Sequence, residues 1–170
     1  MYNREDVYND FLLIRQMKSS FQTKHRMLWE MLGMNGKNKD FWRVVGITEL
    51  AFNKIVENDY KLPKGNKDNK INRSHIKNRI ETSKTMLEGP LMKIDEWWEF
   101  YLENDKCILA TASENLSKQQ ETIKYNVPFG LFECSGFSFK VAAEEINFLK
   151  KLEEENQNGY YYNIRRIIQT

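Results

Sequence analysis

The stretch VVGITELAFNKIVEND, residues 44–59, constrains the fold most strongly, because a glycine there separates two apolar segments. The preceding letters KDFWRVV predict a short helix that ends at Gly46, since glycine tolerates the positive φ of a sharp turn. Thr48 is a typical N-cap residue, and apolar residues three apart predict a second helix over 48–58. We therefore predict two helices that meet at a steep angle, with Ile47 buried in the corner.

Apolar periodicity predicts helices elsewhere in the chain. They cover residues 5–21, 23–33, 72–89, 92–105 and 142–156. Segments rich in β-branched and aromatic residues predict strands, which cover 107–113, 122–133, 137–142 and 160–170. The letters KLPKGNKDNK combine proline, glycine and lysine, and they predict a loop over 61–70.

Gly89 and Pro90 end the helix predicted over 72–89, and we place a domain boundary there. The first domain, 1–89, is predicted to be all-α. The second domain, 91–170, is predicted to be a small α+β unit with an antiparallel sheet. The predicted fold class of the whole chain is therefore α+β.

The two predicted domains differ in charge, although the whole chain has a net charge of only +2. Residues 1–88 carry 17 Lys and Arg against 11 Asp and Glu, a net of +6. Residues 89–170 carry 9 against 13, a net of −4. A basic first half favours a polyanionic partner, and an acidic second half favours a basic one. Charge retained for solubility is the alternative interpretation.

Composition excludes several classes of protein. No apolar run reaches the length of a membrane span, and the polar N-terminus is no signal peptide, so we expect a cytoplasmic protein. Cys107 and Cys134 are expected to be buried free thiols, since a reducing compartment disfavours a disulfide. Spacing typical of a metal site is absent, and so are nucleotide-binding motifs, so neither a metal nor a cofactor is predicted.

The apolar pattern around Gly46 resembles the helix-turn-helix of the phage-repressor and Cro type. Counted from Asn38, the positions that such a unit buries are all apolar here, namely Phe41, Val45, Ile47, Phe52 and Ile55. With its flanking helices the resemblance covers about residues 27–88. Trp42 departs from it, because the family usually has a small residue there. An αα-hairpin in an ordinary helical protein is the alternative interpretation.

The resemblance implies that the second helix enters the major groove of DNA and that basic residues beside it contact phosphates. The implied DNA-binding residues are Thr48, Glu49, Leu50, Asn53, Lys54, Lys61, Lys64, Lys67, Lys70, Arg73 and Lys77. Proteins of this type usually bind in pairs, so the resemblance also implies a homodimer on a palindromic operator in double-stranded DNA.

The second predicted domain shows no catalytic motif. Both histidines, His25 and His75, lie outside it, which excludes histidine-based acid–base chemistry there, and we predict that the protein is not an enzyme. Its carboxylates are instead candidates for contacts with a protein partner. These residues are Asp95, Glu96, Glu99, Glu144, Glu145, Glu153, Glu154 and Glu155.

In size, architecture and composition the whole chain resembles the bifunctional anti-CRISPR proteins of phages and mobile elements in low-GC Gram-positive bacteria. This resemblance implies that the first domain represses the protein's own promoter in the bacterial host cell. It also implies that the acidic domain inhibits an RNA-guided CRISPR effector nuclease of type II by competing for its nucleic-acid channel. The alternative is a plain dimeric repressor whose second domain only oligomerises or senses a ligand.

Overall fold

The computed structural model describes residues 3–35, 43–61, 70–116, 122–132 and 143–168, with backbone alone for 34–35, 43 and 158–168. The described residues form seven helices and a four-stranded mixed sheet, which confirms the predicted α+β class. The elements are α1 (Arg4–Gln16), α2 (Phe21–Asn35), β1 (Arg43–Ile47), α3 (Glu49–Glu57), β2 (Ile71–His75), α4 (Arg79–Glu88), α5 (Ile94–Asn104), β3 (Lys106–Thr111), α6 (Ala112–Leu116), β4 (Tyr125–Asn126) and α7 (Ala143–Ile168).

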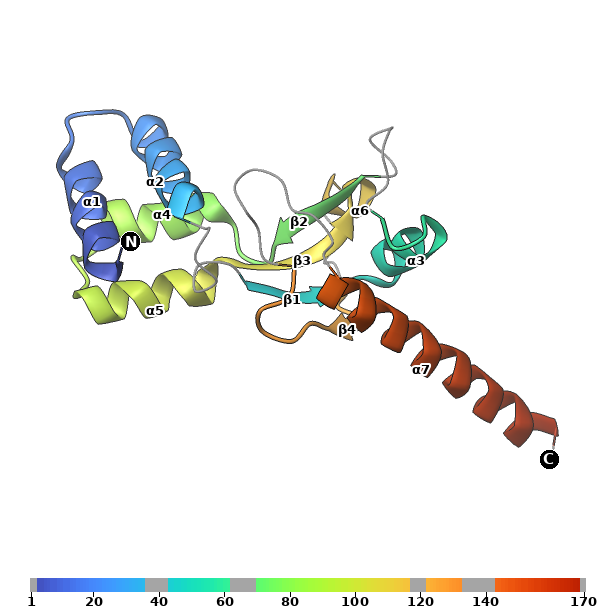
Figure 1. Ribbon diagram of the computed structural model, residues 1–170. Helices are drawn as coiled ribbons and strands as arrows, with labels where there is room; N and C mark the ends of the chain where they lie inside the picture. The colour runs from blue at the N-terminus through green and yellow to red at the C-terminus, as the bar shows by residue number, and fades with distance from the viewer. Residues whose placement is uncertain (1–2, 36–42, 62–69, 117–121, 133–142, 169–170) are drawn as a thin grey trace.

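Helices α1, α2, α4 and α5 pack together at one end of the molecule (Figure 1). The spacing of Val7, Phe11 and Ile14 places three buried side chains on one face of α1, as the apolar periodicity predicts. Asn3 and Asp6 form a capping box at the start of this helix. The stacked rings of Phe11 and Trp97, with centroids 4.9 Å apart, join α1 to α5. We call these four helices the helix bundle.

The sheet lies beside the helix bundle and has the strand order β2-β3-β1-β4 (Figure 1). Strands β1 and β3 are parallel, whereas β2 pairs antiparallel with β3 and β4 pairs antiparallel with β1. Helices α3 and α7 bury apolar side chains against the sheet. The buried residues of this second core include Val44, Ile47, Phe52, Ile55, Ile71, Leu109 and Leu149. We call the sheet with α3 and α7 the sheet region.

The segment around Gly46 is a strand followed by a helix, and not the predicted pair of helices. Residues Arg43–Ile47 form β1, between β3 and β4, and residues 39–42 of the predicted helix lie outside the described residues. Gly46 has no positive φ. A Cβ atom at this position would lie 2.6 Å from Cγ2 of Ile123, so the glycine permits close packing and does not form a turn. The predicted burial of Ile47 and the predicted helix after it are confirmed.

The helix predicted over 72–89 begins only at Arg79, because Ile71–His75 forms the edge strand β2. Ile71 and Ser74 are both buried and lie three residues apart, a spacing that imitates one face of a helix. Residues 71–75 form a strand and not a helix because pairing with β3 supplies the backbone hydrogen bonds of this segment.

The C-terminal segment is also more helical than predicted. The helix predicted over 142–156 is present, but it continues as α7 to Ile168 and replaces the strand predicted over 160–170. The two residues of β4 are the described strand within 122–133, and 137–142 lies outside the described residues. None of the described helices combines the length and the apolar character needed to cross a bilayer.

The hydrophobic cores do not divide at the predicted boundary between residues 89 and 91. Helices α4 and α5, on either side of it, share the core of the helix bundle. The sheet combines β1 and β2 from the first half of the chain with β3 and β4 from the second. The described residues therefore form two cores, and each core is built from both halves of the sequence.

Candidate functional site

The reading helix implied by the resemblance corresponds to α3, and the residue that caps this helix is buried. Thr48 is 2% exposed. Its hydroxyl accepts a hydrogen bond from the backbone N–H of Ala51 over 3.1 Å and donates one to Oε2 of Glu114 over 2.9 Å. The N-cap prediction for Thr48 is therefore confirmed. The same contacts keep its side chain away from the surface, so it is not available to contact a DNA base in this fold.

The exposed face of α3 is acidic. Glu49, Leu50, Asn53 and Glu57 are exposed on it, and Lys54 is half-buried. Two of the four exposed residues are carboxylates: Glu57 repels phosphate groups, and Glu49 lies 3.6 Å from Nζ of Lys124. Helix α3 thus follows a strand and presents an acidic face, which differs on both counts from the helix that the resemblance implies.

The basic residues of the prediction gather along the edge strand β2. Lys70 and Lys77 flank this strand and are exposed, and Arg73 lies within it, half-buried. Lys61 is also exposed, and its Nζ lies 2.9 Å from Oδ2 of Asp59. Two further members lie outside the described residues, Lys64 and Lys67.

The eight predicted partner contacts do not form one surface, because they are divided between α5 in the helix bundle and α7 in the sheet region (Figure 1). On α7, Glu145 is buried and accepts a hydrogen bond from the backbone N–H of Phe132 over 3.0 Å. Glu153 accepts one from the hydroxyl of Tyr60, which raises the pKa of Tyr60 to about 12. The exposed members are Asp95, Glu96 and Glu99 on α5 and Glu144, Glu154 and Glu155 on α7.

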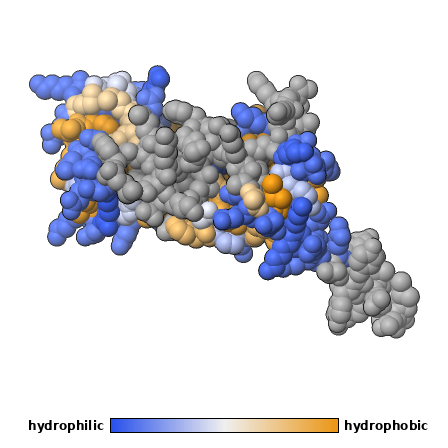
Figure 2. All heavy atoms as spheres, in the orientation of Figure 1, coloured by the Kyte–Doolittle hydropathy of each residue, from blue (hydrophilic) through white to orange (hydrophobic). Residues whose placement is uncertain are grey.

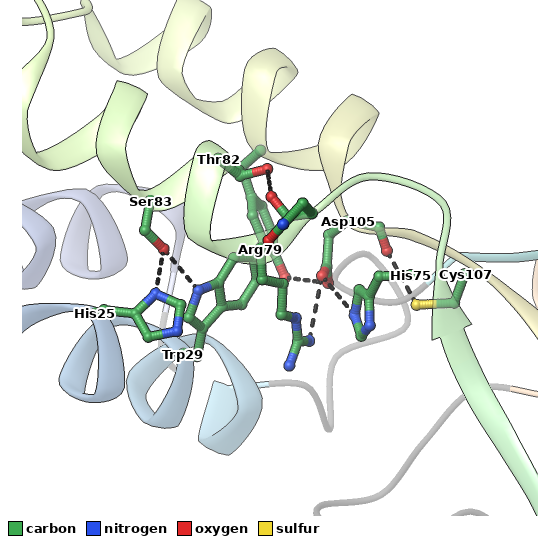
Figure 3. Close-up of polar contacts among 10 residues, drawn as sticks. His25, Trp29, His75, Arg79, Thr82, Ser83, Asp105 and Cys107 are labelled. Carbon is green, nitrogen blue, oxygen red and sulfur yellow. Dashed lines mark hydrogen bonds and ion pairs between the residues drawn. The ribbon is translucent and has the colours of Figure 1, made fainter. Parts of the chain in front are cut away.

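The structure brings together a polar cluster that the sequence did not predict, where the helix bundle meets the sheet (Figure 3). It contains His75 at the end of β2, Arg79 at the start of α4, Asp105 just after α5, and Cys107 in β3. Antiparallel pairing of the two strands places His75 directly opposite Cys107. We call these four residues the junction cluster.

Asp105 is the centre of the junction cluster. It is 3% exposed, and its Oδ1 lies 3.2 Å from Nη2 of Arg79 and 3.0 Å from Nε2 of His75. The hydroxyl of Tyr101 donates a hydrogen bond to Oδ2 over 3.3 Å. Burial raises the pKa of Tyr101, and the Asp105 carboxylate raises it further, so Tyr101 stays protonated. A buried carboxylate is costly without an opposite charge, and Arg79 supplies that charge here.

A second set of hydrogen bonds adjoins the junction cluster on the side of α2 (Figure 3). Nε1 of Trp29 donates to Oγ of Ser83 over 2.8 Å, and the same Oγ lies 2.7 Å from Nδ1 of His25. An indole N–H only donates, so the Ser83 hydroxyl accepts from Trp29. The direction of its hydrogen bond with His25 follows from the tautomer of the imidazole. Burial lowers the pKa of His25, and the nearby Arg79 cation lowers it further, which agrees with a neutral ring.

Arg79 connects these two sets of contacts. Its Cζ lies 4.1 Å from the ring centroid of Trp29, and this cation–π contact holds the guanidinium against the indole. Its Nη2 donates to Oδ1 of Asp105, and its side chain remains 33% exposed. The fold therefore fixes one cation where α2, α4 and the start of β3 meet.

Sequence reasoning missed the junction cluster because its members come from distant segments. The prediction excluded histidine chemistry from the second half on the ground that both histidines lie in the first. In the fold, His75 lies beside Asp105, because β2 pairs with β3 across the predicted boundary. No spacing within a single segment carries this signal, since only the pairing of the two strands creates the cluster.

The structure separates the predicted DNA-binding residues from the predicted partner contacts. Three of the described basic residues, Lys70, Arg73 and Lys77, lie on or beside β2, whereas Lys54 is on α3 and Lys61 pairs with Asp59. The acidic residues are divided between α5 and α7. Comparison with protein-family models, with curated protein sequences and with solved structures gives no match for this chain.

Proposed function

We propose that this protein binds double-stranded DNA through the basic segment 61–79, whose described residues include the edge strand β2 of the sheet. The observation that carries the proposal is the composition of that segment, which holds seven Lys or Arg and one carboxylate, Asp68. Its described part contains β2, the strand at one edge of the sheet. Cations in such a row attract phosphates without any need for a helix in the major groove.

The dimensions of the edge suit a DNA backbone. Strand β2 covers Ile71–His75, and bends follow it at residues 76 and 77. Five residue steps from Lys70 to His75, at about 3.3 Å per residue, give a span of about 17 Å, which corresponds to about five nucleotides along one strand of B-DNA. Arg73 lies within the strand, and Lys77 follows it.

This mode of binding differs from the one implied by the helix-turn-helix resemblance. Phosphate contacts position a protein on DNA but carry no base sequence information. We therefore expect an affinity that depends strongly on salt and weakly on sequence. The exposed face of α3 is expected to point away from the duplex, because Glu57 repels its phosphates.

The test measures the binding of a short fluorescent duplex by anisotropy at several salt concentrations. The double variant Lys70→Gln/Lys77→Gln removes the two exposed cations that flank β2. Each lost phosphate contact reduces the slope of log K against log salt by about 0.9, so the slope should fall by about two. At moderate salt we expect affinity to fall at least about tenfold.

A matched control separates a local effect from an effect of net charge. Lys18→Gln/Lys151→Gln removes the same charge from exposed positions outside β2 and its flanks, and it should leave the slope unchanged. If both double variants weakened DNA binding equally, the effect would come from the net charge of the protein and not from the residues that flank β2. Absence of binding by the wild-type protein even at low salt would end the proposal.

Autorepression, a homodimer on a palindromic operator and inhibition of an RNA-guided nuclease stay predictions. The nuclease prediction is best tested with the full chain in a cleavage assay. Two variant sets, one neutralising the exposed carboxylates of α5 and one those of α7, would show which group carries any inhibition. Inhibition that survives both sets would remove the acidic residues from the explanation.

A further inference from the structure

Three side chains of the junction cluster carry donor atoms that bind transition metals. The donor atoms of His75, Asp105 and Cys107 all lie within 4.8 Å of one another. The sulfur of Cys107 lies 3.3 Å from the backbone oxygen of Asp105, so the thiol already points toward this residue. Two paired strands and the end of a helix thus offer one nitrogen, one oxygen and one sulfur at a single point.

The histidine nitrogen in this set lacks a hydrogen-bond partner within the described part of the chain. Nε2 of His75 is buried and makes no hydrogen bond there, although it lies 3.0 Å from Oδ1 of Asp105. Buried polar atoms in folded proteins nearly always have a partner. A metal ion between the imidazole and the carboxylate would satisfy this nitrogen.

The mixture of donors selects the kind of metal. Magnesium and calcium prefer oxygen donors, whereas a thiolate with an imidazole is typical of zinc. The thiolate and the carboxylate together carry two negative charges, which match a divalent ion. Zinc bonds of about 2.0–2.3 Å place tetrahedral donors about 3.3–3.8 Å apart. Donor pairs as far apart as 4.8 Å therefore need to close by up to about 1 Å, whereas Nε2 of His75 and Oδ1 of Asp105, now 3.0 Å apart, need to separate slightly.

Arg79 holds the position that a metal would compete for. Its Nη2 lies 3.2 Å from the same Oδ1 of Asp105, and a guanidinium repels a second cation there. Arg79 has another partner when it leaves the carboxylate, because it also contacts the ring of Trp29. The hydroxyl of Tyr101 remains on Oδ2 and would orient the carboxylate toward the metal.

From these contacts we infer that His75, Asp105 and Cys107 form a zinc site in which the ion displaces Arg79 from Asp105. The Cys107 thiol loses its proton to solvent as the sulfur–zinc bond forms, so affinity rises with pH. The described residues supply three donors, which leaves a fourth position for water or another small ligand.

The experiment titrates the full-length apoprotein with Co²⁺ and then with Zn²⁺. Cobalt bound to Cys107 gives a thiolate-to-metal charge-transfer band, and tetrahedral geometry gives visible bands, both of which zinc should abolish at one equivalent. Cys107→Ser and His75→Gln should weaken binding more than about 100-fold, since losing a residue that only orients a ligand already costs about 10–100-fold. The charge-transfer band should vanish in Cys107→Ser.

The chain offers matched controls for both variants. Cys134→Ser and His25→Gln change the other cysteine and the other histidine, and both should leave the titration unchanged. Arg79→Gln should tighten zinc binding at least about tenfold, because it removes the competing cation. Tighter zinc binding by Arg79→Gln distinguishes a metal site from a purely structural ion pair. If the pair were only structural, the loss of Arg79 would not increase the affinity for any ligand.

Circular dichroism identifies variants that do not fold, and His75→Gln on the edge strand is the milder of the two ligand changes. The inference is overturned if neither wild type nor Arg79→Gln gives a thiolate-to-cobalt band up to pH 8. It is also overturned if Cys134→Ser removes the band while Cys107→Ser retains it.

Discussion

The helix bundle and the sheet region are built from different kinds of contact. Aromatic rings contact one another mainly in the helix bundle, where Trp97 lies 4.9 Å from Phe11 and 6.1 Å from Tyr101 between ring centroids. Aliphatic side chains such as Val44 and Leu109 make up most of the buried core of the sheet region. Figure 2 shows hydrophilic residues interspersed with hydrophobic patches on the visible surface of both parts. The two regions thus keep separate cores although the chain passes between them several times.

This difference explains which elements could be predicted. A bundle helix can be predicted from its own segment of sequence, because its buried residues repeat every three or four positions. A strand of the sheet region depends on a partner far along the chain, as β1 depends on β3. The sequence therefore predicted α1, α2 and α5 correctly, and it assigned helix to both β1 and β2.

The largest expected effect comes from a truncation in each core. Trp97→Ala in the helix bundle should cost about 3–5 kcal/mol of unfolding free energy, and Leu109→Ala in the sheet region about 2–5 kcal/mol. Both side chains are fully buried. Since Cys107 of β3 also belongs to the bundle core, we expect one cooperative transition in both variants.

Denaturant unfolding checks this expectation with two signals. With Trp42 replaced by Phe, tryptophan fluorescence comes from the bundle residues, including Trp29 and Trp98, and reports on the helix bundle. Far-ultraviolet circular dichroism reports on both regions. If the two signals gave the same unfolding midpoint, the helix bundle and the sheet region would unfold as one cooperative unit. A variant in which only the fluorescence midpoint falls would show that the helix bundle unfolds by itself.

The second effect concerns the junction between the regions. Asp105→Ala removes the carboxylate that binds Arg79 and receives the Tyr101 hydroxyl. We expect a loss of about 2–3 kcal/mol, below the usual cost of breaking a buried ion pair because Arg79 remains partly exposed. Thermal melting of Asp105→Ala against the isosteric Asp105→Asn measures it. Equal stability of both variants and the wild type would contradict the role of this ion pair.

The third effect tests why residue 46 is a glycine. Gly46→Ala introduces a Cβ atom that meets Ile123, so we expect a cost of about 1–3 kcal/mol from overpacking. Ile123→Ala in the same chain should recover most of that loss. If a positive φ were the reason for the glycine, the second substitution would recover nothing, and the assignment of β1 would fail.

The smallest effect is a dependence of stability on pH. The native state lowers the pKa of His25 below its ordinary value of 6.5, so the unfolded chain binds a proton more readily. Stability should therefore fall as the pH drops through about 6.5, and this part of the slope should disappear in His25→Gln. Urea denaturation at a series of pH values measures both slopes. If His25→Gln did not change the slope of stability against pH, another titratable group would be responsible for that slope.

The candidate site was less accessible to sequence reasoning than the fold. The basic character of 61–79 and the N-cap role of Thr48 follow from local letters, and the cap is confirmed. The contact of His75 with Asp105 could not be predicted, since their 30-residue separation becomes a contact only through strand pairing. Tertiary partners also decide whether a charged residue is buried, as Glu145 illustrates.

The position of β3 between β2 and β1 sets an order in which the molecule can be completed. Both neighbouring strands, β1 and β2, are synthesised before β3. They therefore cannot form their hydrogen bonds with β3 until Lys106–Thr111 has left the ribosome. Closing contacts between such distant segments slows folding and leaves strand edges open meanwhile. A nascent chain that stops short of this strand contains all four bundle helices but lacks the strand on which the sheet assembles.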